Sequence, residues 1–233
     1  MGELLYVANL SRPHIAYAVS QLCRYMARKR HIELAFRVLR YLKQTVASKL
    51  IYRCNNDLTI VYADADYNNN PQSKSNTGWM VFHYGNLIFW RSQRQSVVAL
   101  STTKAEITAM TSKSTEAVYV MNLMREILPA HLVRPFVFFC DNNSAVATVH
   151  IGGKFQRVKH YTTRVNYIFD CIDEKVFEVE HVGTEEMLAD GLTKPVTRQR
   201  LQFLYTSAEL VLDCGGVFRS PTHDFIPSQS SGK

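Results

Sequence analysis

The amino-acid sequence predicts an α/β protein with one mixed sheet. Between residues 51 and 204, segments with the composition of strands alternate with segments that have helical periodicity, as in α/β folds. The segment FVFFC, residues 136–140, is apolar throughout, which is typical of a strand covered on both faces of a sheet. The apolar runs on either side of Tyr84-Gly85-Asn86 predict a hairpin, and hence antiparallel strands in the same sheet.

Residues 1–50 predict an N-terminal helical appendage, with two helices after residue 11. Pro13 suits the first turn of the first helix, and apolar residues recur at helical spacing through both. One face of the second helix carries a basic stripe formed by Arg37, Arg40 and Lys43. This stripe is either a solvated helix face or a surface for phosphate groups. The apolar faces of two such helices need a partner, because the pair is too small to form a core alone.

The elements expected after residue 50 begin with a strand over 58–64, which is rich in β-branched and aromatic residues. The hairpin follows over 77–93. A long helix is expected over 103–128, where apolar residues are spaced alternately three and four apart. The remaining elements are the strand at 136–140, helices over 143–150 and 161–175, a strand over 176–183 and a helix over 184–190.

The last helix is expected to have Thr184 as its N-cap and Gly191 at its end. After residue 204 the sequence becomes rich in Pro and Ser. We therefore expect 205–233 to form a largely disordered C-terminal tail.

The composition narrows the class of protein. A chain of 233 residues with 46% hydrophobic residues can bury one core, and a formal charge of +7 favours a polyanionic partner or a basic soluble surface. The five cysteines are odd in number and include no C-x-x-C pair, which argues against disulfides or structural zinc. No apolar run approaches the ~20 residues of a membrane span, and the start is not a secretory signal. We expect a soluble intracellular protein.

Several acidic residues stand at the ends of expected elements, and each has an ordinary explanation. Asp64 and Asp66 end the first strand and could be turn residues. Glu106 could complete a capping box, Thr103-x-x-Glu106, at the start of the long helix. Asp141 could cap the helix that follows it, and Asp190 could be a surface acid.

Together these acids suggest a site. In sheet-based folds ligands bind beyond strand ends, where Asp64 and Asp141 are expected. Clustered carboxylates raise each other's pKa unless a cation neutralises them, and Mg²⁺ suits such oxygen ligands. Two ions about 4 Å apart can activate water and stabilise the leaving oxygen in phosphodiester cleavage. A basic protein with an acidic centre has the charge distribution expected of a nuclease, and the spacing of the acids permits them to meet.

Successive motifs resemble a known family. YADADYNN, SNTGWMVFHYGNLIFWRSQRQSVVALSTTKAEITAM, CDNNSAV, KHY and HVGTEEMLADGLTKP are similar, in order and spacing, to the ribonuclease H domain of copia-type LTR retrotransposon Pol polyproteins. The upstream segment resembles the part of the reverse transcriptase that precedes this domain. The resemblance implies a helical remnant of the thumb or connection over 1–50, a domain over 51–204 with an RNase H-like fold, and a tail over 205–233. The implied fold is a five-stranded mixed sheet flanked by helices.

The resemblance also implies an activity, which is endonucleolytic hydrolysis of RNA in RNA–DNA hybrids with two Mg²⁺ or Mn²⁺ ions. The family's catalytic and metal-binding acids carry over to Asp64, Glu106, Asp141 and Asp190, and Asp66 receives no role. His160 matches a family histidine; it could shuttle a proton, bind phosphate, or be structural. The parent polyprotein would supply the polymerase domain, within a cytoplasmic retroelement particle or, alternatively, the nucleus.

Contacts to the hybrid are expected from residues near these acids. Ser101 and Thr102 open the long helix and could offer hydroxyl or N–H groups to a phosphate, and Asn142 lies beside Asp141. A basic stretch would suit backbone phosphates, although a solvated loop is the alternative. Its members are Lys154, Arg157, Lys159 and Arg164.

The sequence departs from the family in three places. KHYTTRVN stands where the family has KHIDIRYH, and Gly191 replaces an apolar residue after Asp190, which is expected to loosen that helix end. No Tyr-x-Asp-Asp polymerase motif occurs, so we expect no reverse transcriptase activity and a fragment of a retroelement. The rival hypothesis is a non-catalytic nucleic-acid-binding relic of such an element.

Overall fold

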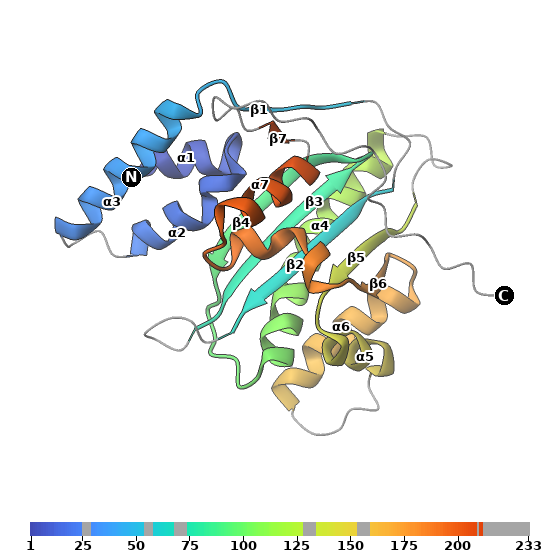
Figure 1. Cartoon of the computed structure of the whole chain (residues 1–233). Coiled ribbons are helices and arrows are strands. Elements are labelled where there is room, and N and C mark those ends of the chain that lie inside the picture. The colour runs from blue at the N-terminus through green and yellow to red at the C-terminus, as the bar shows by residue number, and fades with distance from the viewer. Residues whose placement is uncertain are drawn as a thin grey trace.

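The computed structural model describes residues 1–24, 29–53, 58–67, 74–127, 134–152, 159–208 and 210–211, with the backbone alone at 29–30, 159–160 and 210–211. Its elements, shown in Figure 1, are α1 (Gly2–Leu10), η1 (Pro13–Ile15), α2 (Ala16–Arg24), α3 (Lys29–Gln44), β1 (Lys49–Leu50), β2 (Ile60–Asp66), β3 (Asn76–His83), β4 (Asn86–Arg94), α4 (Thr102–Ile127), β5 (Phe136–Cys140), α5 (Asn143–Ile151), α6 (Lys159–Asp173), β6 (Phe177–His181), η4 (Thr184–Glu186), η5 (Leu188–Leu192), α7 (Arg198–Ser207) and β7 (Leu210–Val211).

The main sheet has five strands in the order β4-β3-β2-β5-β6. β2, β3 and β4 pair antiparallel, whereas β5 and β6 run parallel to β2. The hairpin between β3 and β4 turns at Tyr84 and Gly85, whose φ angles are 50° and 72°. Positive φ at both positions matches the twist of the flanking strands, so the hairpin is confirmed. The predicted mixed sheet flanked by helices is confirmed with it.

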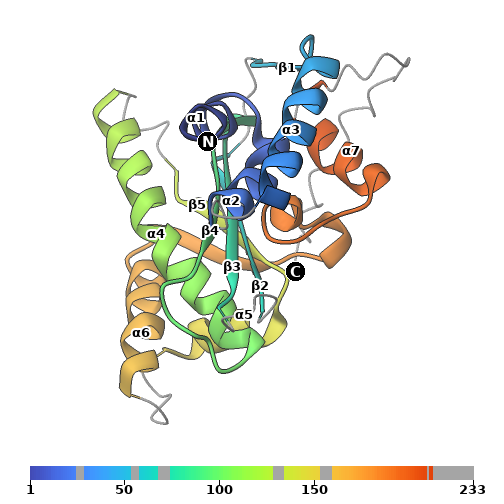
Figure 2. The same cartoon turned by 90° about the vertical axis from the view of Figure 1, so that its left-hand side faces the viewer.

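Helices cover both faces of this sheet, as the edge-on view shows (Figure 2), and an apolar cluster lies on each face. Successive side chains of a strand point to opposite faces. Val61 and Ala63 of β2 accordingly lie in the cluster with α4, α5 and α6, whereas Tyr62 lies in the cluster with the N-terminal helices, η5 and α7. Each face is therefore buried by its own set of helices.

The N-terminal helices pack directly on the sheet. Trp90 of β4 donates its indole N–H to the carbonyl of Ala8 in α1 at 2.7 Å, and the Tyr205 hydroxyl of α7 donates to the carbonyl of Pro13 at 3.2 Å. Val19 of α2 is fully buried in the same cluster. The partner that these apolar faces need is therefore the sheet face itself, together with α7.

Several predicted elements differ from the structure. α1 was not expected, because a short segment beginning at Gly2 offers little helical pattern to recognise. The segment 184–190 forms η4 and part of η5 in place of one helix, and Thr184 makes no side-chain cap. Met187 has an extended backbone between the two turns, which allows both Met187 and Leu192 to be fully buried. Tertiary packing overrides local helix preference here.

The expected boundary before the C-terminal tail falls inside α7, where Tyr205 is fully buried. Beyond α7, β7 pairs antiparallel with β1. The rest of the expected tail, 212–233, lies outside the described residues, and the division of the chain into three domains stays a prediction. Among the helices that the structure describes, none combines the length and apolar character needed to cross a bilayer.

Candidate functional site

The candidate site lies where β2 and β5 end side by side. The chain leaves β2 toward β3 on one side and leaves β5 toward β6 on the other, so the connections diverge from two parallel neighbours. Such a switch point leaves a crevice at the carboxyl ends of the strands. The pairing of β2 with β5 stops at Tyr62, although β2 continues to Asp66. Backbone groups of β2 beyond that point are available to side chains.

Glu106 of α4 uses one of these backbone groups. Its Oε1 accepts a hydrogen bond from the N–H of Ala65 at 3.2 Å, and its side chain is buried. The expected capping box between Thr103 and Glu106 is wrong, because Ser101 caps α4 by accepting from the N–H of Lys104 at 3.2 Å. Glu106 therefore stands too far along the helix to reach back to the cap, and faces the end of β2.

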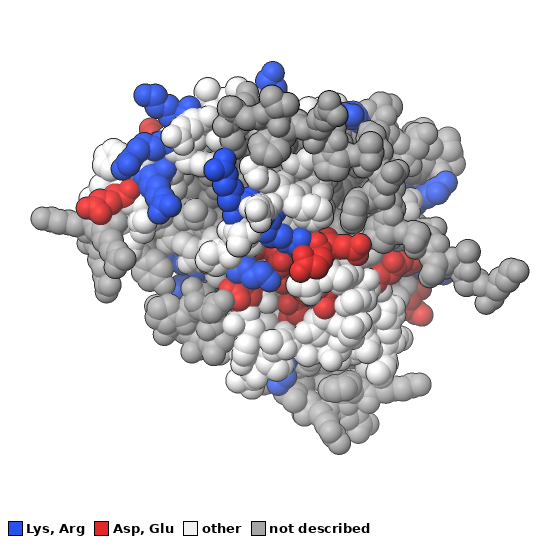
Figure 3. Space-filling model, in the orientation of Figure 1, with Lys and Arg blue, Asp and Glu red and all other residues white. Residues whose placement is uncertain are grey.

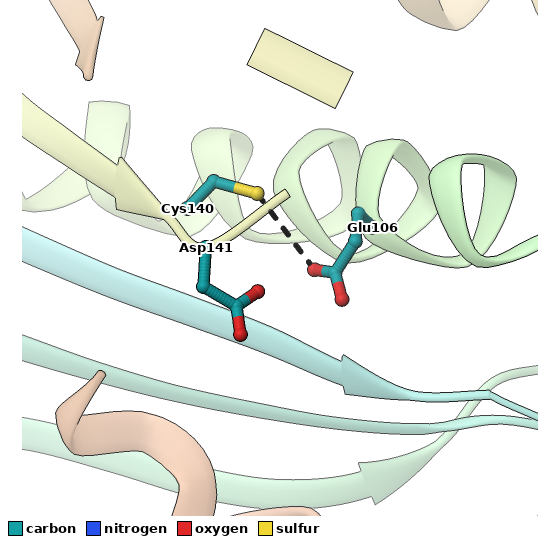
Figure 4. Close-up of side chains that lie close together, drawn as sticks. All are labelled: Glu106, Cys140 and Asp141. Carbon is teal, nitrogen blue, oxygen red and sulfur yellow. Dashed lines mark hydrogen bonds between the residues drawn. The ribbon is translucent and has the colours of Figure 1, made fainter. Parts of the chain in front are cut away.

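Asp141 follows β5 and is partly exposed. It is not the cap of α5, since Asn142 accepts from the N–H of Ala145 at 2.9 Å and caps that helix. The Asp141 carboxylate points into the same space as Glu106 (Figure 4). One potential ligand atom from each of Glu106, Cys140 and Asp141 lies within 4.8 Å of the others, so this set could hold a metal ion.

Asp64 is the buried carboxylate contributed by β2. Its Oδ2 accepts a hydrogen bond from the Thr193 hydroxyl, which comes from the segment directly after η5. Gly78 pairs with Asp64 across β2 and β3. A Cβ at Gly78 would lie only 2.6 Å from Cβ of Leu192, so the absence of a side chain there allows η5 to approach Asp64.

Asp190 is buried within η5 and contacts two basic side chains. Lys194 Nζ lies 2.7 Å from its Oδ1, and Arg200 Nη2 lies 3.3 Å from its Oδ2. A Cβ at Gly191 would lie 3.2 Å from Cδ1 of Leu204 in α7. Gly191 therefore lies close against α7, and the expectation that it loosens this segment stays a prediction.

The electrostatics of the four acids show that they act on one another. Burial raises the pKa of Asp64 to about 7; the Thr193 hydrogen bond opposes this shift and the charge of Asp190 adds to it. Burial, followed by the charges of Asp64 and Asp141, holds the pKa of Glu106 well above its usual range. Burial and the charge of Asp190 raise the pKa of Asp141. The structure therefore brings Asp64, Glu106, Asp141 and Asp190 into one mutually repelling cluster, although they come from four separate elements.

One face of the molecule is mixed in charge. Acidic side chains gather in the middle of the face that Figure 3 shows, with Lys and Arg side chains directly beside them. Further basic side chains spread over the side that α3 and α7 form in Figure 1. Acidic and basic side chains are therefore neighbours on this face (Figure 3).

The residues expected to contact nucleic acid are only partly placed by the structure. Ser101 and Asn142 each cap a helix, and Thr102 is exposed as the first residue of α4. Arg164 of α6 donates to the Thr108 hydroxyl at 2.6 Å and so joins α6 to α4. Contact of these residues with a hybrid stays a prediction.

The other expected basic and proton-carrying residues are less completely described. Lys159 and His160 begin α6, but their side chains lie outside the described residues. Lys154 and Arg157 lie outside them altogether. Their expected roles therefore stay predictions.

Sequence reasoning missed four residues of the site. They are Cys140, Thr193, Lys194 and Arg200. The four-residue spacing of Asp190 and Lys194 is a recognisable ion-pair spacing and could have indicated that contact. No local pattern links Thr193 to Asp64, because they lie far apart in the sequence and meet only through the packing of η5 on the sheet.

The fold and this cluster define an RNase H-like domain: a five-stranded mixed sheet flanked by helices, with acids at the switch point. No family model matches the chain. The Retrovirus-related Pol polyprotein from transposon TNT 1-94 of Nicotiana tabacum is 33% identical over 205 residues, and that from transposon RE1 of Arabidopsis thaliana is 32% identical over 206 residues. The chain is therefore homologous to a segment of copia-type retrotransposon Pol polyproteins.

Each of these alignments covers 87% of this chain but only 15% or 14% of the relative, so the chain spans about a seventh of their length. Among solved structures, LC11-RNase H1 isolated from compost is 17% identical, with a TM-score of 0.44. That match covers 58% of this chain and 92% of the other. We assign the fold from the strand order and directions described above.

Proposed function

We propose that this chain hydrolyses RNA in RNA–DNA hybrids as an endonuclease, with two Mg²⁺ or Mn²⁺ ions bound by Asp64, Glu106, Asp141 and Asp190. The observation that carries the proposal is the convergence of these carboxylates at the switch point, where burial and mutual repulsion raise the pKa of Asp64, Glu106 and Asp141. The relationship to Pol polyproteins supports a hybrid as the substrate, since reverse transcription generates one.

The residues fit hard divalent cations. Carboxylate oxygens are the preferred ligands of Mg²⁺, and a buried group of them is costly until a cation neutralises it. The Cys140 thiol is the soft member of the possible ligand set. Burial and the charge of Glu106 hold its pKa well above its usual range, so it stays protonated at neutral pH and forms part of the wall. The oxygen ligands then dominate the site.

Each acid is positioned by a different contact. The N–H of Ala65 orients Glu106, and the Thr193 hydroxyl orients Asp64. Asp141 is the more exposed acid, which suits the side from which a phosphodiester would enter. Bound ions would activate a water molecule and stabilise the leaving oxygen. His160, in the first turn of α6, is proposed to carry a proton or to bind phosphate.

Binding of the hybrid is proposed to involve both ends of the acidic centre. Ser101 and Thr102 lie at the start of α4, and Asn142 lies at the start of α5. The basic residues proposed for the phosphate backbone are Lys154, Arg157, Lys159 and Arg164. In the parent polyprotein the polymerase domain would share this binding, within a cytoplasmic particle or in the nucleus.

The experiment that tests the function is cleavage of end-labelled RNA in an RNA–DNA hybrid with Mg²⁺. We expect cutting of the hybrid but not of single-stranded RNA, and a loss of at least about a hundredfold in rate for Asp141→Asn. Activity that survives EDTA, or that Asp141→Asn leaves intact, would contradict the proposed site. Hybrid binding without cleavage would instead support the non-catalytic relic.

A further inference from the structure

Lys194 places a positive charge inside the acidic centre. It follows η5 in the sequence, and its Nζ lies 2.7 Å from Oδ1 of Asp190. The Lys194 side chain is 36% exposed, whereas that of Asp190 is 6% exposed. The ammonium group therefore reaches inward from the surface to a buried carboxylate.

The charge of Lys194 acts on the whole cluster. Burial is the largest influence on the pKa of Asp64, Glu106 and Asp141 and raises each, but the Lys194 charge opposes that shift at all three. The contact of Lys194 with Asp190 is an ion pair. The position of the Lys194 ammonium group beside Asp190 therefore lets its positive charge offset part of the repulsion among the acids of the site.

Arg200, the other cation on Asp190, is held differently. Its Nη1 donates to the carbonyl of Glu185 at 2.5 Å, and its Nη2 donates to the carbonyl of Thr184 at 2.8 Å. Its guanidinium also lies over the ring of Phe203. Arg200 thus fastens η4 and η5 to α7. Lys194 has a flexible stem and a compact charge, so it can turn toward solvent without opening the fold.

We propose that Lys194 is the resident counter-ion of the acidic centre, and that Lys194 and a divalent cation compete for Asp190. Metal binding then displaces the ammonium from Oδ1 of Asp190, and Lys194 sets the metal concentration at which the site fills. This inference rests on the proposed function of the site as a divalent-metal centre. Its physical basis is that the Lys194 ammonium group already occupies a lone-pair site of Asp190 Oδ1 at 2.7 Å, and that its positive charge repels a cation approaching the same carboxylate.

The first test measures Mn²⁺ binding by calorimetry at pH 7.5 for the full chain and three variants. Lys194→Met is expected to bind Mn²⁺ about tenfold more tightly than the natural chain, which corresponds to about 1.4 kcal/mol. Lys194→Arg keeps the charge and is expected to stay near the natural affinity. Lys43→Met removes one positive charge from the exposed end of α3 and should leave the affinity unchanged.

The outcomes separate this inference from the proposed function. If the natural chain binds no Mn²⁺ and no Mg²⁺, the metal centre itself is wrong. If the natural chain binds metal and Lys194→Met binds it equally or more weakly, Lys194 does not compete, and the inference fails while the metal centre stands. Equal tightening in Lys43→Met would mean that net charge alone accounts for the effect, which would also overturn the inference.

A second measurement uses the unaltered chain and so does not depend on the folding of any variant. Lysine acetylation by an amine-reactive ester, followed by mass spectrometry, reports how available each ammonium group is. We expect the acetylation rate of Lys194 to rise several-fold when Mg²⁺ is added, while that of Lys43 stays constant. If the acetylation rate of Lys194 does not rise at metal concentrations that fill the site, the metal does not displace Lys194 from Asp190, and the inference fails.

Discussion

Asp64 shows how burial and neighbouring charge act on one residue. Its pKa in the folded protein is about 7, against an ordinary value of 3.8. Between these two pH values the folded chain keeps a proton on Asp64 that the unfolded chain has released. The free energy of unfolding therefore falls as pH rises through this window, because the folded state binds more protons. The cost is complete above about pH 7, where a bound cation would offset it.

Asp64→Asn removes this titration. In EDTA we expect the melting temperature of the variant to exceed that of the natural chain by several degrees at pH 8, with a much smaller difference at pH 4. Thermal unfolding followed by circular dichroism measures both curves. Adding Mg²⁺ at pH 8 should stabilise the natural chain more than the variant. Two pH profiles that run parallel would show that Asp64 does not titrate in this range.

Gly78 allows η5 to pack closely on β3 because it has no side chain. A Cβ there would lie 2.7 Å from Cγ2 of Thr193 and 2.9 Å from the carbonyl oxygen of Ala189, besides the contact with Leu192. We expect Gly78→Ala to cost about 1–3 kcal/mol of stability. Each kcal/mol corresponds to a fall of about 2–4 °C in melting temperature for a chain of this size.

Gly183→Ala is the matched control, because a Cβ at Gly183 would have Glu186 Oε2 at 3.8 Å as its nearest contact. Its backbone has φ −64°, which alanine adopts without strain. Equal losses of stability in both variants would show that the approach of η5 to Gly78 is not what the first substitution disturbs.

A chain of hydrogen bonds connects four elements to the acidic centre. Arg24 at the end of α2 donates to Oδ1 of Asn76 in β3 at 2.7 Å, and Nδ2 of Asn76 donates to the carbonyl of Thr193 at 3.3 Å. The Thr193 hydroxyl then donates to Asp64 of β2. The position of η5 relative to β2, and so the orientation of Asp64, depends on an amide in a third element and on a helix of the N-terminal region.

Asn76→Ala breaks this connection and leaves buried polar groups unpaired. We expect a loss of about 1–3 kcal/mol in the free energy of urea unfolding, together with weaker Mn²⁺ binding, because Thr193 loses one of the contacts that hold it beside Asp64. Asn122→Ala, on the exposed side of α4, is the control and should change neither quantity. Lost stability with unchanged Mn²⁺ affinity would show that the connection does not reach the metal site.

At the scale of the whole molecule, the N-terminal helices and the sheet share one apolar cluster. α1 and α2 lie over the sheet face that also carries Tyr62 and Trp90, and α7 closes the same cluster with Tyr205 (Figure 1). Because removal of either part would expose the other, we expect the described chain to unfold in one cooperative transition. A single transition would argue against the predicted domain boundary at residue 50.

Val19→Asp places a charge in this shared cluster, where Val19 is fully buried. We expect a loss of at least about 3 kcal/mol from the whole unfolding transition. Helix content from circular dichroism and tryptophan fluorescence should shift together in urea. Tyr6→Asp, at a side chain that is 67% exposed, is the control and should be nearly neutral. Separate transitions for the two signals would show that the N-terminal helices are an independent unit.

The fold was largely predictable because its signals are local. The hairpin follows from Gly85 and the apolar runs beside it, and α4 follows from apolar residues repeated over its length. The segment 184–190 was not predictable, since its turns form to bury Met187 and Leu192 against elements distant in the sequence. α1 was missed for the same reason, because contacts with the sheet stabilise a segment with a weak helical pattern.

The sequence by itself determined which acids form the site, because their motifs are contiguous stretches of sequence. It also determined the α/β class, because strand and helix periods are local properties of the chain. The arrangement of the acids in space could not be predicted from the sequence. The hydrogen bond of Ala65 to Glu106, the support of Asp64 by Thr193, and the pairing of Asp190 with Arg200 each join separate elements. The order of residues in the sequence does not give the distances between such elements. These distances, and the balance of charges at the site, are set by the packing of α4 and η5 around the end of β2.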